Sequence, residues 1–117
     1  MTSTPQPPQT DHLAALQRHL ATAPRRYPGG PLPPVVCRDG FSMSVQASAG
    51  TYCSPREDVG PWTAVEIGYP NRIEPLLFDY AETWGNWTET VYGWVPITLA
   101  AAVIEVHGGA VEGEASR

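Results

Sequence analysis

Hydrophobic and polar residues are most regularly ordered between residues 91 and 109. The first part contains the β-branched and aromatic residues that a half-buried strand requires, namely Val91, Tyr92, Trp94 and Val95. Pro96 follows, and because proline suits the first position of a helix, the apolar residues that recur at helical spacing over 97–104 predict a helix from there. Gly108 and Gly109 accommodate the left-handed backbone that ends a helix. The pattern predicts a strand that runs directly into a C-terminal helix.

Two further stretches have the alternating pattern of β-strands. Residues 35–47 predict a hairpin, because Asp39-Gly40 favours a tight turn. Apolar residues follow this turn at every second position: Phe41, Met43, Val45 and Ala47. Residues 62–69 predict the next strand, with a core-facing side formed by Thr63, Val65, Ile67 and Tyr69. Residues 74–82 fit a short strand and one to two helical turns equally well, and 83–90 predict an exposed connection.

Together these elements predict an α+β fold, in which a small antiparallel sheet of about four strands packs against the C-terminal helix. The compact domain is expected to span residues 34–109, because most of the thirteen prolines lie before it. Residues 1–33 are expected to form a flexible N-terminal arm, and residues 110–117 a disordered tail.

The N-terminal arm contains one helical pattern. Thr10 or Asp11 can cap a helix over 11–23, whose apolar face is formed by Leu13, Leu16 and Leu20. An isolated helix of this length is barely stable in water, so its apolar face needs a cover. The helix therefore either docks on the domain or serves as a partner-binding arm, and the sequence leaves both alternatives open.

The charge distribution bears on the class of partner. Residues 34–109 contain nine acidic residues and three arginines and carry a net charge of −6, within a chain of net charge −5. Such a domain repels nucleic-acid phosphates, so we expect no direct nucleic-acid binding and favour a host protein or complex with a basic surface. A homodimer is a further partner that would bury apolar surface of so small a domain. With no signal peptide, no apolar run of membrane-spanning length and two cysteines, we expect a cytoplasmic protein that does not bind membranes.

Several blocks of sequence carry a resemblance to a known family. They are DGFSMSVQAS (39–48), TYCSPRED (51–58), VEIGYP (65–70), EPLLFDYAE (74–82) and TVYGWVPITLAAAVIEVHGG (90–109). In these blocks the chain resembles small, mostly uncharacterised proteins of bacteriophages, prophages and mobile elements. The resemblance implies a phage-associated accessory role in the cytoplasm of a host bacterium, and it implies no catalytic residue.

Candidate catalytic residues have simpler explanations. Cys53 lies near Arg56 and would need a base such as His107 to act as a nucleophile, whereas a cysteine between a tyrosine and a serine is usually a small buried hydrophobe. Cys37, Cys53 and His107 lack the paired spacing of zinc ligands. We therefore expect that the protein is not an enzyme and that it has no catalytic residue, no metal site and no cofactor.

The leading hypothesis is a non-catalytic interaction protein that inhibits or modulates a host nucleic-acid-handling or defence complex, in the manner of an anti-CRISPR protein. Aromatic anchors beside acidic residues are the expected partner-binding set: Tyr80, Glu82, Trp84, Trp87 and Glu89. Both tryptophans also suit a small core. One alternative is a ligand-binding domain or enzyme in which Tyr52, Cys53 and Arg56 hold an anion or other ligand. Another is a virion structural or assembly protein.

Overall fold

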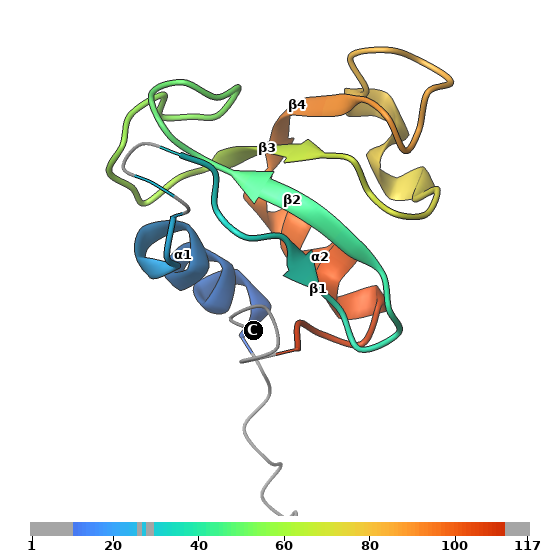
Figure 1. Ribbon diagram of the computed structural model, residues 1–117, viewed down its shortest axis with the longest axis horizontal. Helices are drawn as coiled ribbons and strands as arrows, with labels where there is room; N and C mark the ends of the chain where they lie inside the picture. Colours follow the sequence, from blue (N-terminus) through green and yellow to red (C-terminus); the bar gives the residue numbers. More distant parts are fainter. Residues whose placement is uncertain (1–10, 26, 28–29, 112–117) are drawn as a thin grey trace, which may run out of the picture.

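The chain forms a four-stranded antiparallel sheet with the strand order β1-β2-β3-β4, flanked by helices (Figure 1). This computed structural model describes residues 11–25, 27 and 30–111, and predictions for residues 1–10 and 112–117 lie outside them. The elements are α1 (His12–Thr22), β1 (Val35–Val36), β2 (Ser42–Gln46), β3 (Ala64–Gly68), the 3₁₀-helix η1 (Pro75–Tyr80), β4 (Val91–Pro96) and α2 (Ile97–Val106). The predicted α+β fold is confirmed. No helix in the described ranges is long and apolar enough to cross a membrane.

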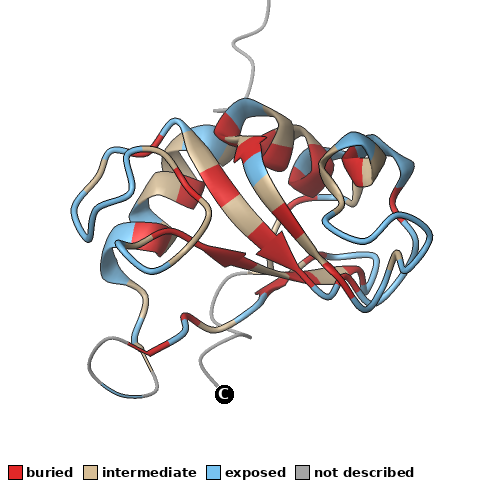
Figure 2. Cartoon of the chain, turned by 90° about the horizontal axis from the view of Figure 1, so that it is seen from above, coloured by how far each residue is buried: buried red, intermediate tan, exposed pale blue. Residues whose placement is uncertain are grey.

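The hairpin of β1 and β2 follows the predicted alternation. Gly40 has a φ of 90° in the turn, and the Asp39 carboxylate accepts a hydrogen bond from the N–H of Phe41. The apolar residues at alternate positions are all buried: Phe41, Met43, Val45 and Ala47. Figure 2 shows how buried and partly buried positions alternate along the strands, so that one face of the sheet forms the core.

β3 is shorter than the strand predicted over 62–69. Val65 and Ile67 face the core as expected, but Thr63 and Tyr69 are exposed, and Trp62, expected on the opposite side, is buried. The physical reason is that the chain leaves the sheet at both ends. Tyr69 has a φ of 50°, outside the range of a strand.

β4 passes into α2 without an intervening loop, as predicted, and α2 lies across the back of the sheet in Figure 1. Pro96 is the last residue of β4 and the N-cap of α2, so the helix begins at Ile97, one position later than predicted. The predicted apolar face is buried: Ile97, Ala100, Ala101, Val103 and Ile104. Gly108 and Gly109 have φ values of 92° and 89° and end the helix as predicted.

α1 docks on the domain and packs against α2. Asp11 caps it by accepting a hydrogen bond from the N–H of Ala14, and Leu16 and Leu20 are buried in the common core. The core therefore extends to the N-terminal side of residue 34, where we expected the domain to begin. At the other end, Val111 donates its N–H to the carbonyl of Val36, so residues 110–111 pair with β1 although we expected them in a disordered tail.

Candidate functional site

A β-bulge in β4 displaces one tryptophan from the core. Val65 of β3 pairs with Val95, but Ile67 pairs with Tyr92, so Gly93 and Trp94 together lie opposite a single residue of β3. Trp94 has a φ of 50°, in the left-handed region that costs a non-glycine residue about 1–2 kcal/mol. Its side chain is 51% exposed as a result.

Tyr52 is held against this bulge by its own backbone. The Glu66 carboxylate accepts the N–H of Tyr52 at 3.0 Å, and the Tyr52 carbonyl accepts the N–H of Trp94 at 3.0 Å. Gly93 leaves room for this approach, because a Cβ there would lie 3.3 Å from the Cβ of Tyr52. The rings of Tyr52 and Trp94 stack with their centroids 4.9 Å apart.

The segment after η1 completes a shallow groove beside this pair. Ala81 forms an antiparallel bridge with Tyr92, and the N–H of Glu82 donates to the carbonyl of Val91 at 2.9 Å. These contacts fix the backbone around Tyr80 and Glu82 along the outer edge of β4. The resulting groove, which we call the Trp94 groove, has a volume of about 310 Å³ and is lined by Tyr52, Tyr80, Glu82, Gly93 and Trp94.

A second aromatic group, the Phe78 cluster, consists of Phe78, Trp84 and Trp87. Phe78 and Trp87 stack with their centroids 3.9 Å apart, and Trp84 packs edge-on against both rings. The hydroxyl of buried Tyr92 donates to the carbonyl of Trp87, which ties the loop to β4. Trp84 is 67% exposed, whereas Trp87 is partly buried, so the cluster presents one tryptophan to solvent.

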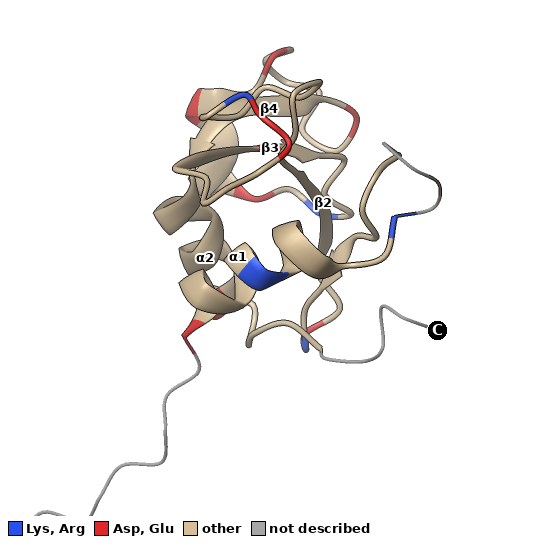
Figure 3. Ribbon diagram, turned by 90° about the vertical axis from the view of Figure 1, so that its left-hand side faces the viewer, with Lys and Arg blue, Asp and Glu red and all other residues tan. Residues whose placement is uncertain are grey.

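Acidic positions recur around the end of the molecule that carries β3 and β4, whereas α1 shows an arginine (Figure 3). Asp79, Glu82 and Glu89 are exposed there. The guanidinium of Arg56 lies over the ring of Tyr52, 5.7 Å from its centroid. The surface around β4 therefore combines aromatic side chains with an excess of negative charge.

The structure joins residues from two separately predicted sites. Tyr80 and Glu82, expected in the partner-binding set, line the same groove as Tyr52, expected in the alternative ligand loop. Glu89, by contrast, is an exposed residue that does not line this groove. Trp94 was missed because its place in an apolar strand predicts burial. The available signal was Gly93, since a glycine inside a strand often marks a bulge.

The hydrogen bonds of Cys53 do not include His107, the base that nucleophilic catalysis by this cysteine would need. Cys53 is buried, and its sulfur lies 3.1 and 3.3 Å from the carbonyl oxygens of Ser48 and Pro55, which share its single S–H as acceptors. Burial and the negative charge of Asp39 raise the pKa of the Cys37 thiol to about 11. Within the described residues, no group of three or more His, Cys, Asp and Glu side chains is placed to hold a metal ion.

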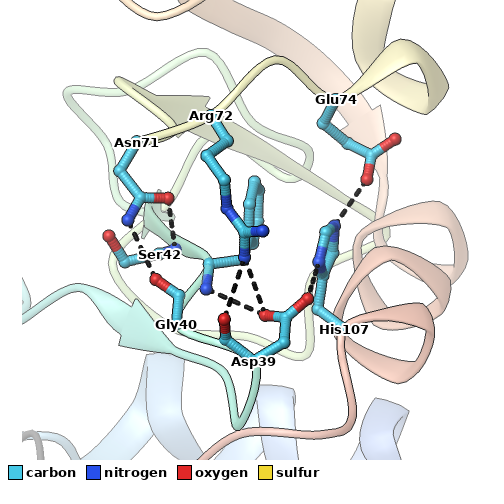
Figure 4. A network of polar contacts seen from close by, with 8 residues as sticks. Asp39, Gly40, Ser42, Asn71, Arg72, Glu74 and His107 are labelled. Atoms are coloured by element: carbon cyan, nitrogen blue, oxygen red, sulfur yellow. Dashed lines mark hydrogen bonds and ion pairs between the residues drawn. The ribbon is translucent and has the colours of Figure 1, made fainter.

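His107, at the end of α2, takes part in a network with the β1–β2 turn and the start of η1 (Figure 4). Its Nδ1 lies 2.6 Å from an oxygen of Asp39, its Nε2 lies 2.6 Å from an oxygen of Glu74, and its ring stacks on Phe41. Arg72 pairs with Asp39 at 3.0 Å. Since both ring nitrogens face carboxylates, neither is free to act as a base toward Cys53.

The same contacts set the pKa values in this network. Burial alone would lower the pKa of His107, but hydrogen bonds and charge from Asp39 and Glu74 together raise it. The N–H of Phe41 lowers the pKa of Asp39, and His107 and Arg72 act in the same direction. His107 therefore joins the β1–β2 turn, the start of η1 and the end of α2, and the two carboxylates favour the protonated form of its ring.

No protein-family model matches the sequence, and searches of curated proteins and of solved structures also find no match. None of these comparisons therefore indicates a function.

Proposed function

We propose that this protein is a non-catalytic interaction domain, which binds a partner protein through the aromatic and acidic surface around β4. The observation that carries the proposal is the outward position of Trp94. A strained bulge and two backbone contacts of Tyr52 hold this large apolar side chain in solvent. Strain of this kind persists where the surrounding structure enforces it, and it is concentrated at functional sites.

The composition of the surface supports a protein partner. Tryptophan and tyrosine dominate the residues that contribute most binding energy in protein interfaces. Trp84 and Trp94 are both exposed, and each is stacked or packed against other aromatic rings that limit its freedom. A side chain that is already ordered loses less conformational entropy on binding.

The charge of the domain supports a basic partner. Net charge of −6 over residues 34–109 accelerates encounter with a positive surface and opposes nucleic-acid binding. The resemblance to phage and mobile-element proteins favours a host complex as the source of that surface. Inhibition of a nucleic-acid-handling or defence complex is the form of this function that we favour.

The test compares partner capture by matched variants. Tagged wild-type protein is used to capture a partner from the natural host, and the purified partner is then titrated with the variants Trp94→Ala, Trp84→Ala and Tyr69→Ala. Tyr69 is the control, because it is 62% exposed and has the same left-handed backbone as Trp94 but lines neither the Trp94 groove nor the Phe78 cluster.

We expect Trp94→Ala and Trp84→Ala each to weaken binding about tenfold or more, and Tyr69→Ala to leave it unchanged. Binding should also weaken as salt is added, because the charges are screened. Equal binding by all three variants would overturn the proposal. Stabilisation by phosphates or nucleotides that required Arg56, in the absence of any protein partner, would instead favour the ligand-binding alternative.

A further inference from the structure

We propose that the Trp94 groove binds an arginine side chain presented by the partner protein. This inference deepens the proposed function and rests on it. Three of the five groove residues are aromatic and one is a carboxylate. A cation is the ligand that both kinds of group attract, since aromatic faces are negative and Glu82 carries a full charge.

Glu82 is available for such a ligand. Within the described residues, ion pairs join Asp39 to Arg72 and to His107, and Glu74 to His107. None of them involves Glu82. Its backbone is fixed by the bond to Val91, and its side chain is exposed. The carboxylate can therefore meet a cation without breaking an existing pair.

A guanidinium fits the groove better than an ammonium. It is planar, so it stacks on an aromatic ring while its N–H groups bind a carboxylate in a bidentate manner. The chain already places its own arginines over aromatic rings: Arg56 lies over Tyr52 and Arg72 over Phe41, at 5.7 and 5.9 Å from the ring centroids. The Arg72 guanidinium also pairs with the Asp39 carboxylate, which reproduces the combination expected in the groove.

The free aromatic surface locates the ligand within the groove. Tyr52 already contacts the ring of Trp94 and the guanidinium of Arg56. The surfaces left for an incoming arginine are therefore those of Trp94 and Tyr80, with Glu82 as the carboxylate. This arrangement predicts that Glu82 and Trp94 contribute jointly to recognition.

The test uses short peptides and the full chain. The ¹⁵N-labelled protein is titrated with Ac-Gly-Arg-Gly-NH₂, and the indole N–H signal of Trp94 and the amide of Gly93 are followed by NMR. The same titration is made with the lysine and citrulline analogues at equal ionic strength. Citrulline keeps the shape of arginine and removes its charge. The variants are Glu82→Gln and, as a control away from the proposed binding surface, Glu105→Gln, at an exposed position of α2.

We expect saturable shifts at Trp94 and Gly93 with the arginine peptide, weaker shifts with lysine and none with citrulline. Glu82→Gln should weaken binding of the arginine peptide about tenfold, and Glu105→Gln should leave it unchanged. Equal shifts with citrulline, stronger binding of lysine, or no shift with any peptide would each overturn the inference. A partner that required Trp94 but bound equally well after its arginines were replaced by lysine would leave the proposed function standing and remove this inference alone.

Discussion

His107 and Glu74 lie 33 positions apart in the sequence, and Nε2 of the histidine is 2.6 Å from Oε1 of the glutamate. Nδ1 of the same ring faces Asp39, so the end of α2 is joined to two other parts of the chain. With carboxylates on both sides, the ring donates two hydrogen bonds only when it is protonated.

Folding stability should therefore fall as the pH rises above the ordinary pKa of histidine. The pKa of His107 is raised in the folded state, so its contribution is complete below about pH 6.5 and is lost as the pH rises through the folded pKa. His19 acts in the opposite sense. Burial lowers its pKa, so this residue decreases the folding stability as the pH falls below about 6.5.

The measurement is urea unfolding from pH 5.5 to 9, together with an NMR titration of His107. Glu74→Gln should lower the pKa of His107, reduce the stability at pH 6 by about 1–3 kcal/mol and flatten the pH dependence. Glu105→Gln, an exposed substitution on α2, should change neither the pKa of His107 nor the pH dependence of the stability. A His107 that titrated at or below the ordinary value would contradict the network.

Neither cysteine should react readily in the folded protein. Cys37 and Cys53 are each 1% exposed, and the thiol of Cys53 is hydrogen-bonded to two carbonyls. Labelling with a thiol reagent at pH 7 should be slow for both and become rapid in urea, because unfolding exposes the thiols. Fast modification of Cys53 in the native state would revive the nucleophile considered from the sequence.

The elements that were predictable from the sequence are those set by local patterns. The strand-to-helix junction at Pro96 and the alternation after Gly40 each depend on residues close together in the chain. The form of residues 74–82 was not predictable, because a 3₁₀-helix of six residues has no distinct hydrophobic period.

The candidate site could be predicted only in part, because some of it depends on contacts between residues far apart in the chain. The aromatic and acidic composition of residues 80–89 indicated a binding surface, but the bulge decides which aromatic is presented. Tyr92 and Val95 are both fully buried although they are three positions apart, which is possible only because the extra residue rotates the strand. Docking of Tyr52 from a distant loop likewise depends on tertiary contacts with Glu66 and Trp94.

α1 should contribute substantially to stability. Leu20 is buried and Leu13, on the same helix, is 37% exposed. Leu20→Ala should lower the free energy of unfolding by about 2–5 kcal/mol, and Leu13→Ala by less than about 1 kcal/mol, as measured by urea unfolding. Equal effects of the two substitutions would mean that α1 does not belong to the folded core.

The two tryptophans of the Phe78 cluster should differ in their effects on stability. Trp87 is partly buried and stacked on Phe78, so Trp87→Ala should destabilise the protein by about 1–3 kcal/mol. Trp84 is mostly exposed, so Trp84→Ala should cost less than about 1 kcal/mol. Thermal or urea unfolding of both variants checks this, and a larger loss for Trp84 would place it in the core and remove it from the binding surface.

Gly93 should be the position at which a single methyl group disturbs the Trp94 groove. A Cβ there would lie 3.3 Å from the Cβ of Tyr52, closer than ordinary contact, so Gly93→Ala should push Tyr52 away from Trp94 and cost about 1–3 kcal/mol. The loss of the stacked pair should appear in the near-ultraviolet circular dichroism of the aromatic rings. Gly68→Ala is the matched control, because its Cβ would meet Val91 at an ordinary 3.6 Å in the same sheet. If both alanine variants kept the aromatic signal and bound the partner as the wild type does, the close approach of Tyr52 to β4 would not be what shapes the groove.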